Sequence, residues 1–206
     1  MATLLDIIRD DLYRYRGNTS LRAFLSAYIK DPGFRFVYYL RKVAFYRKWS
    51  RSVGLIAYAY NRVVLNHYRF KYGFDISPAA TIGPGFYLSS HFGKVVIGQN
   101  AVIGANCNIA HGVTLGTTQR GRYKGTPTLG DRVWVGADAT IMGKVRIGND
   151  ALIGPNTFVN RDVPPGAVVL GNPGKIISFL GSEDYVNFRV SVGAPLGDHV
   201  EALITV

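Results

Sequence analysis

The sequence predicts a mainly β protein: a parallel β-helix of six-residue repeats with an N-terminal α-helical domain. Aliphatic residues recur at every sixth position through the second half of the 206-residue chain. A period of six fits neither the 3.6-residue period of a helix nor the two-residue period of a hairpin strand. It fits a three-sided solenoid in which six residues form one face and about 18 form one coil. The runs are Ile76, Ile82, Leu88; Ile97, Ile103, Ile109, Leu115; and Leu129, Val135, Ile141, Ile147, Ile153, Val159.

Glycine directly follows many of these aliphatic residues. We expect each aliphatic side chain to point into the prism and the next residue to enter a sharp turn, where the missing Cβ of glycine avoids a clash. The glycines in this position are Gly83, Gly98, Gly104, Gly116, Gly130, Gly136, Gly148 and Gly154.

Before the repeat, the sequence predicts four helices, each marked by a capping or a terminating residue. These residues are Thr3 with Asp6, Thr19 or Ser20, Asp31 with Pro32, and Gly73. The second helix should end near Lys30, the third near Trp49, and the fourth should run from near Ser52 to Tyr72.

The repeat divides the chain into three parts. Residues 1–74 form the expected helical domain, residues 75–173 the β-helix, and residues 174–206 a C-terminal extension. Within this extension, residues 175–180 can pack as a short segment.

Two breaks in the repeat force backbone out of the prism. Leu88 to Ile97 is nine residues, three more than one face, and this excursion contains His91. Leu115 to Leu129 is fourteen residues, two more than two faces, and it contains the polar, basic loop TTQRGRYKGTP. Loops on a rigid scaffold commonly carry chemistry, so both breaks are candidate sites.

The composition indicates a folded protein of a reducing compartment. An apolar content of 48% argues against disorder. The single cysteine, Cys107, excludes an internal disulfide and occupies a core position of its hexad. The N-terminus lacks the features of a signal peptide, and no run of about 18 apolar residues exists. We therefore expect a cytoplasmic protein.

The net charge of +11 is concentrated in the helical domain. Residues 1–74 carry 14 Lys or Arg against 4 Asp or Glu, whereas residues 75–206 carry 10 against 9. Basic, aromatic helices can lie peripherally on the inner face of the membrane. They can equally cap the open end of the prism and mediate contacts between subunits. No nucleic-acid-binding motif accompanies the charge, so we expect no nucleic-acid partner.

His91 is the candidate general base. An imidazole in such an excursion can project into a cleft and accept a proton near neutral pH. Asp75 lies sixteen residues earlier, close to the length of one coil, so its carboxylate can reach the same corner of the prism and orient the ring.

His111 is a second candidate, either as a substrate contact or as a solvent-exposed or interface histidine. His67 and His199 stand in positions more typical of structural or solvated residues. The sequence has no cysteine pair and no closely spaced histidine pair, so we expect no metal. It also lacks a glycine-rich phosphate loop and a Gly-x-Ser-x-Gly elbow.

The chain resembles the hexapeptide-repeat acyltransferases, most closely the branch of serine acetyltransferases and polysaccharide O-acetyltransferases. The resemblance covers roughly residues 75–180 and is carried by DISPAATIGPGFYLSSHFG, IGQNAVIGANCNIAHGVTLG and VWVGADATIMGKVRIGNDALIGPNTFVNRDVPPGAVVLGNPGKII. It implies a left-handed β-helix that works as a homotrimer, or as a dimer of trimers. It also implies an active site between neighbouring subunits and acetyl-CoA as the acyl donor.

The resemblance also implies roles for individual residues. His91 matches the catalytic base of the family, and Asp75 matches the aspartate that pairs with it. The positions that match the CoA groove are Gly116, Thr117, Ala137, Pro155 and Lys175. The implied reaction is direct transfer of an acetyl group to a hydroxyl without a metal. The candidate acceptor-binding residues are Ser90 and His111.

For the acceptor, we expect a sugar hydroxyl, free or lipid-linked, in the synthesis of capsule, exopolysaccharide or lipopolysaccharide. Serine acetyltransferases usually have Asp before the catalytic His, where this chain has Ser90. They usually have Arg-His-Pro at the end of the long loop, where this chain has Gly125-Thr126-Pro127. They also have a longer N-terminal helical region than the 74 residues of this chain. The alternatives are serine O-acetylation in cysteine biosynthesis and a non-catalytic β-helix scaffold.

Overall fold

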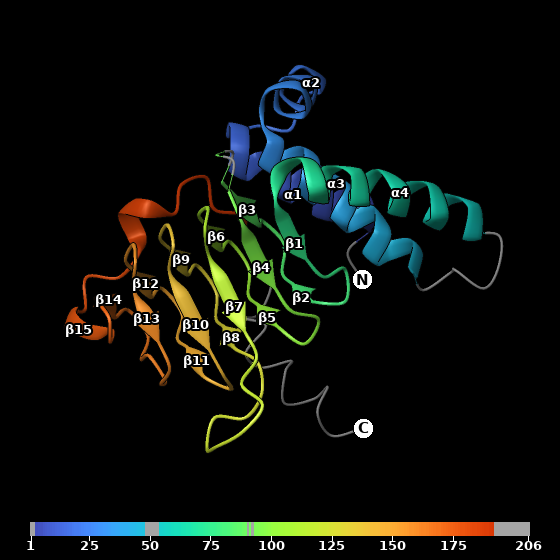
Figure 1. Ribbon diagram of the computed structural model, residues 1–206. Coiled ribbons are helices and arrows are strands. Elements are labelled where there is room, and N and C mark those ends of the chain that lie inside the picture. Colours follow the sequence, from blue (N-terminus) through green and yellow to red (C-terminus); the bar gives the residue numbers. More distant parts are fainter. Residues whose placement is uncertain (1–2, 48–53, 90, 92, 192–206) are drawn as a thin grey trace.

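The computed structural model describes residues 3–47, 54–89, 91 and 93–191 as four helices followed by a three-sided prism of short strands (Figure 1). The expected fold class is confirmed: the chain is mainly β, a left-handed parallel β-helix with an N-terminal α-helical domain. The helices lie at the end of the prism where the first strands begin (Figure 1).

The four helices begin and end close to the predicted residues. They are α1 (Leu4–Arg16), α2 (Leu21–Lys30), α3 (Pro32–Tyr46) and α4 (Leu55–Tyr72). Thr3 and Asp6 form a capping box, the Ser20 hydroxyl accepts from the N–H of Ala23 at 3.2 Å, and Gly73 ends α4 in the left-handed conformation. Asp31 precedes α3 without a side-chain cap bond, because its carboxylate binds Arg16 instead. The predicted boundaries Trp49 and Ser52 lie outside the described residues.

The prism has three sheets, one for each face, whose strands are parallel apart from the last. The first contains β1 (Phe74–Ile76), β4 (Val95–Ile97), β7 (Thr114–Gly116), β10 (Thr140–Met142) and β13 (Phe158–Val159). The second contains β2 (Thr81–Ile82), β5 (Val102–Ile103), β8 (Thr128–Leu129) and β11 (Arg146–Ile147). The third contains β3 (Tyr87–Leu88), β6 (Asn108–Ile109), β9 (Trp134–Val135), β12 (Leu152–Ile153), β14 (Val168–Leu170) and the antiparallel β15 (Lys175–Ser178).

The hexad aliphatics form the core of the prism, as the repeat predicts. Twelve of the thirteen are at most 3% exposed, and only Ile82 is partly exposed. Strand register stacks them directly, since Ile97 pairs with Leu115 and Ile103 with Leu129 on successive coils. Each coil therefore adds one layer of aliphatic side chains to a continuous core.

The glycines that follow the aliphatics serve a different purpose from the one expected. None of the eight adopts a positive φ, so none is needed for the turn conformation itself. They are needed for stacking: a Cβ on Gly104 would lie 2.4 Å from the carbonyl oxygen of Gly130 on the next coil. The left-handed turn falls two residues later, at non-glycine residues with φ between 53° and 59°. These are Asn106, Arg132, Asp138, Asp150 and Asn156.

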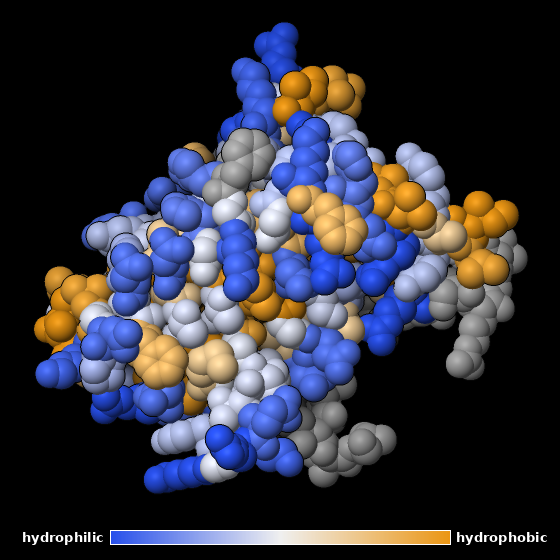
Figure 2. Space-filling view, viewed as in Figure 1, coloured by the Kyte–Doolittle hydropathy of each residue, from blue (hydrophilic) through white to orange (hydrophobic). Residues whose placement is uncertain are grey.

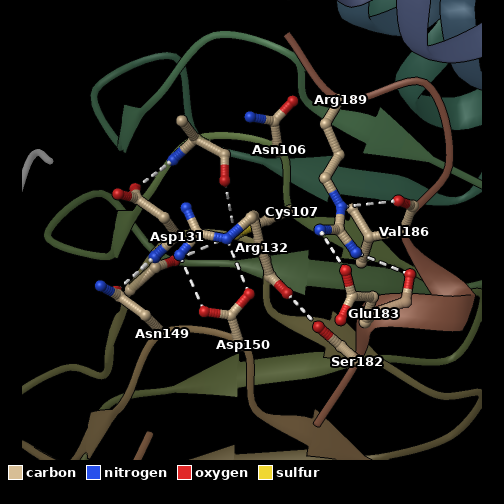
Figure 3. A network of polar contacts seen from close by, with 12 residues as sticks. Asn106, Cys107, Asp131, Arg132, Asn149, Asp150, Ser182, Glu183, Val186 and Arg189 are labelled. Carbon is tan, nitrogen blue, oxygen red and sulfur yellow. Dashed lines mark hydrogen bonds and ion pairs between the residues drawn. The ribbon is translucent and has the colours of Figure 1, made fainter. Parts of the chain in front are cut away.

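The C-terminal extension is packed against the prism as far as Val190. After β15, Ser182 donates to the carbonyl oxygen of Arg132, whose guanidinium binds Asp150 at 2.7 Å (Figure 3). The segment then runs along the third sheet toward α1. Asn106 and Val190 exchange two hydrogen bonds of 3.0 and 2.8 Å there.

The outward faces of α2 and α4 carry exposed apolar side chains, seen as two hydrophobic areas over these helices in Figure 2. Leu21, Leu25 and Ile29 form a stripe on α2, and Ile56, Tyr60 and Val63 form one on α4. Within the described part of the chain, no helix combines the length and the apolar character needed to cross a bilayer. The contact of residues 1–74 with a membrane surface stays a prediction.

Candidate active site

The His91 excursion leaves the prism between β3 and β4. The Ser89 hydroxyl, at the start of the excursion, lies 3.1 Å from Nδ1 of His91 and also accepts the backbone N–H of His91 at 3.3 Å. With a hydrogen on Nδ1 donated to Ser89, the Nε2 lone pair is available to accept a proton. The ring is exposed, as a base that meets an external hydroxyl must be.

His111 lies beside His91. The centroids of the two imidazole rings are 5.6 Å apart, and the close approach depends on Gly93, where a Cβ would lie 3.1 Å from Cβ of His111. The structure therefore brings together the two histidines that the sequence singled out. The third nearby candidate, Ser90, lies outside the described residues.

Asp75 has a partner other than the one expected. It lies in β1 opposite Val96, points outward and is 55% exposed, and its carboxylate binds the Arg69 guanidinium of α4 at 2.7 Å. Among the described residues, no hydrogen bond joins Asp75 to His91, and the partner of the carboxylate comes from α4 instead. Arg69 was missed in the sequence, since nothing in a helical segment marks one arginine as the partner of a later aspartate.

A small polar hollow borders this ion pair. Its volume is about 170 Å³, and α4 supplies two guanidinium groups to its wall. The lining residues that carry charge are Arg62, Arg69 and Asp75. Both signs of charge are therefore available within one recess next to the first coil.

Four of the five predicted CoA-groove residues lie along two edges of the first sheet, and the fifth, Lys175, lies in the third sheet. Gly116 ends β7, and Thr117 next to it pairs its hydroxyl with that of Thr126 at 3.2 Å across the base of the long loop. Ala137 and Pro155 follow strands of the third sheet on successive coils, at the edge that leads into the first sheet. Lys175 opens β15 and lines a separate hollow of about 200 Å³ with Arg161.

The long loop borders a larger, open recess over the first sheet. It measures about 420 Å³ and is lined by Arg120, Arg122, Tyr123, Met142 and Phe158, among others. An apolar floor with two guanidinium groups at its rim suits a ligand that combines an aliphatic arm with phosphates. The sequence pointed to this loop by its length and basic character but did not single out the two arginines.

Two other sequence predictions concern this region. Cys107 is fully buried, and burial raises the pKa of its thiol to about 12, as a core residue requires. Over residues 3–47, 54–89, 91 and 93–191, no group of three or more His, Cys, Asp or Glu side chains is arranged to hold a metal ion.

Two family models match the repeat. Residues 126–161 match the bacterial transferase hexapeptide (six repeats), and residues 94–118 match the hexapeptide repeat of succinyl-transferase. The prism is therefore of the kind that hexapeptide-repeat transferases build.

Similar proteins and solved structures indicate a narrower group than the two family models do. The serine acetyltransferase of Mycobacterium tuberculosis is 43% identical over 129 residues, which cover 63% of this chain and 54% of that protein. The serine acetyltransferase of Neisseria gonorrhoeae, solved in complex with serine, superposes with a TM-score of 0.68 at 32% identity and covers 85% of this chain and 69% of that one. A serine acetyltransferase solved in complex with CoA superposes with a TM-score of 0.69 at 27% identity. The match covers 84% of this chain and 69% of that one. This chain spans about half the length of the curated relatives it matches.

The chain belongs to the hexapeptide-repeat acyltransferase family, in its serine acetyltransferase branch. The expectation of a sugar acceptor in polysaccharide synthesis is wrong, because the relatives and the solved structures are consistently serine acetyltransferases. That expectation gave too much weight to the loss of charged residues around Gly125. It could not foresee that α4 brings Arg62 and Arg69 beside Asp75.

Proposed function

We propose that this protein is an acetyl-CoA-dependent serine O-acetyltransferase. The observation that carries the proposal is the superposition, over 85% of the chain, on a serine acetyltransferase solved in complex with serine. The local geometry agrees with it, since an exposed imidazole stands in an excursion of a rigid prism beside a second imidazole. An inert scaffold would not need either feature.

In this proposal His91 is the general base. Nε2 removes the proton from the serine hydroxyl, and the oxygen forms a bond to the thioester carbonyl carbon of acetyl-CoA. Collapse of the tetrahedral intermediate breaks the carbon–sulfur bond, and the imidazolium returns its proton to the departing thiolate. The products are O-acetylserine and CoA, with no redox change and no metal in the step. A positioned base of this kind contributes roughly 10²–10⁴-fold in rate.

Serine also presents a carboxylate and an ammonium group, which need partners. The Arg62 and Arg69 side chains and the Asp75 carboxylate supply both signs of charge in the hollow beside β1. These groups support a zwitterionic acceptor even though the long loop reads Gly125-Thr126-Pro127. Asp75 is also proposed to favour the imidazolium of His91 when the site closes around its substrates.

Acetyl-CoA fits the face between the long loop and the later turns. Gly116 packs against the sulfur of Met142, and an added Cβ would lie 2.2 Å from it. Without a side chain at this position, the outer surface of the strand leaves room for a ligand. Arg120 and Arg122 stand at the rim of the 420 Å³ recess, where phosphates can bind. In this arrangement the proposed contacts of CoA are Gly116, Thr117, Ala137, Pro155 and Lys175.

We further propose a homotrimer whose neighbouring subunit completes the site. His91 is exposed at an edge of the prism, and a second prism packed along that edge would cover it. Light scattering on the purified protein tests this, and a monomeric mass at micromolar concentration would contradict it.

The test of the function is product formation. Purified protein is incubated with acetyl-CoA and L-serine, and the products are separated and compared with O-acetyl- and N-acetylserine standards by mass spectrometry. We expect O-acetylserine in an amount equal to the CoA released, and no product with D-serine or in the absence of protein. CoA release that does not depend on L-serine would refute the proposed acceptor.

A further inference from the structure

Strand β3 leads into the His91 excursion and is the edge strand of the third sheet. On one side it pairs with β6, and the N–H groups of Tyr87 and Ser89 donate to the carbonyl groups of Cys107 and Ile109. On the other side, no strand is present in the described part of the sheet, so alternate backbone groups of residues 85–88 need other partners.

Helix α1 supplies those partners from one face. The Asp11 carboxylate accepts the N–H of Phe86 at 2.8 Å, and Nε of Arg14 donates to the Gly85 carbonyl at 3.1 Å. The Tyr15 hydroxyl forms two hydrogen bonds with the backbone of Leu88: it donates to the carbonyl oxygen at 2.7 Å and accepts from the N–H at 2.9 Å. Residues 11, 14 and 15 are spaced i, i+3, i+4, so they lie on the same side of the helix. Three side chains of α1 thus replace a neighbouring strand.

A second contact fixes the same point of the chain. At Gly33, in the first turn of α3, an added Cβ would lie 2.2 Å from the Leu88 carbonyl oxygen and 2.9 Å from that of Ser89. The helix therefore touches the backbone where the excursion begins. The last strand residue before His91 is held between Tyr15 and Gly33.

We infer that Tyr15 is a positioning residue for His91: its hydroxyl fixes the end of β3 and so sets where the imidazole stands relative to the acceptor hydroxyl. The inference rests on the proposed function. Beyond Leu88 the Ser89 N–H still donates to Ile109, but His91 is exposed and the chain pairs with the first sheet again only at β4, so a displacement of Leu88 should be transmitted to the ring.

The Tyr15 hydroxyl is suited to this role. Its ring is clamped between Tyr87, at a centroid distance of 4.5 Å, and Phe34, at 5.3 Å. Burial raises the pKa of the Tyr15 hydroxyl well above its ordinary value, so near neutral pH the group keeps its hydrogen and donates to Leu88. Because a displacement of about 1 Å can cost about 10²-fold in rate, a loosened anchor three residues away should be visible in kcat.

The experiment compares Tyr15→Phe with Tyr13→Phe. Both tyrosines lie on α1, and Tyr13 packs its ring against Phe188, away from β3. Steady-state kinetics with L-serine and acetyl-CoA is measured below the melting temperature of each variant. We expect Tyr15→Phe to lower kcat by about tenfold or more with both KM values within about twofold of wild type. Tyr13→Phe should match wild type.

Gly33→Ala provides a second route to the same displacement. Its methyl group would meet the Leu88 carbonyl oxygen at 2.2 Å, so the variant should displace the end of β3 and also lower the melting temperature. Gly104→Ala, whose methyl group would meet the next coil at 2.4 Å, is the control for destabilisation alone. With both variants measured below their melting temperatures, kcat should fall more in Gly33→Ala than in Gly104→Ala.

Hydrogen exchange distinguishes failure of the inference from failure of the proposed function. Amides of residues 86–91 should exchange faster in Tyr15→Phe than in Tyr13→Phe, whatever the substrate is. If wild type makes no O-acetylserine, the proposed function fails and exchange still reports whether Tyr15 holds the segment. A folded Tyr15→Phe with unchanged kcat, or with unchanged protection of residues 86–91, would overturn the inference.

Discussion

The guanidinium of Arg41 and the carboxylate of Asp11 form a buried ion pair between α3 and α1, with Nε and Oδ2 2.8 Å apart. Arg41 is 9% exposed and Asp11 1%. The pair is also bound to the prism, since Arg41 donates to the carbonyl groups of Ile82 and Gly83 at 2.6 Å each. It therefore joins two helices and the first coil at one point.

Asp11→Ala should be strongly destabilising, because it leaves the Arg41 charge buried without its counter-ion. Loss of one partner of a buried pair costs about 3–5 kcal/mol. Urea unfolding at pH 7 measures the change in the free energy of unfolding. The matched control is Glu183→Ala, which removes an exposed pair with Arg189 at 3.6 Å and should cost less than about 1 kcal/mol. Equal losses in the two variants would show that the buried pair does not join the two parts.

The glycines of the repeat differ in what surrounds them, and this gives a second prediction. Gly104 and Gly98 both follow a core isoleucine, and neither has a positive φ. A Cβ at Gly104 would meet the next coil at 2.4 Å, whereas at Gly98 the nearest atom is the Thr117 hydroxyl at 3.8 Å. Gly104→Ala should therefore cost about 1–3 kcal/mol or more, as overpacking does. Gly98→Ala should be neutral or stabilising by up to about 1 kcal/mol, because alanine restricts the unfolded chain.

Thermal unfolding of the two variants measures this contrast directly. If both alanines lowered the melting temperature by the same amount, the glycines would be required by local backbone conformation and not by the spacing of the coils.

The period of six was enough to predict the prism, since it is a local property of the chain that the core aliphatics obey on every coil. The helices were also predictable, because Thr3, Ser20 and Gly73 act on their own neighbours in sequence. The role of the glycines in stacking could not be predicted, because it depends on which residue of the next coil lies opposite each glycine. The left-handed turn was within reach, since asparagine and aspartate recur three residues after the aliphatics and favour that conformation.

The site divides in the same way. His91 was found because a break in a regular repeat is visible in one dimension. The partners of Asp75 and Leu88 were not found, since Arg69 and Tyr15 come from helices whose packing on the prism has no sequence period. Asp75 illustrates the limit: its spacing of sixteen residues from His91 indicated one coil, whereas β1 pairs Asp75 with Val96 on the next coil and α4 supplies an arginine as its partner.

Cys107 makes stability depend on pH in the alkaline range. Burial raises the pKa of its thiol from 9.0 to about 12, so above pH 9 the unfolded chain loses this proton while the folded chain keeps it. The unfolded state then binds fewer protons, and stability falls as pH rises, by about 1.4 kcal/mol per pH unit for this group between pH 9 and 12. Below pH 9 the thiol has little effect, because both states are protonated.

Unfolding free energies of wild type and Cys107→Ala at pH 8, 9 and 10 test this. The variant should be less stable at pH 8, because a core atom is lost, but its stability should fall less steeply up to pH 10. A second measurement tests the burial itself: at pH 8 the Cys107 thiol should not react with a thiol reagent in the native protein, but it should react fully in urea. Rapid reaction of the native protein would show that the prism opens at this coil.

The last prediction concerns which group orients the proposed base. His91→Ala should lower kcat by roughly 10²–10⁴-fold, because it removes the proton acceptor. Ser89→Ala removes a neutral hydrogen bond to Nδ1, which is worth about 0.5–1.5 kcal/mol, so it should cost about tenfold or less. Asp75→Asn keeps the shape but removes the charge that would favour the imidazolium, and we expect a larger loss than in Ser89→Ala. All three are measured as kcat with saturating L-serine and acetyl-CoA, and their unchanged melting temperatures serve as the control. If Asp75→Asn kept kcat within about twofold of wild type while Ser89→Ala did not, the hydroxyl seen beside the ring would be its orienting group, and Asp75 would serve only to bind Arg69.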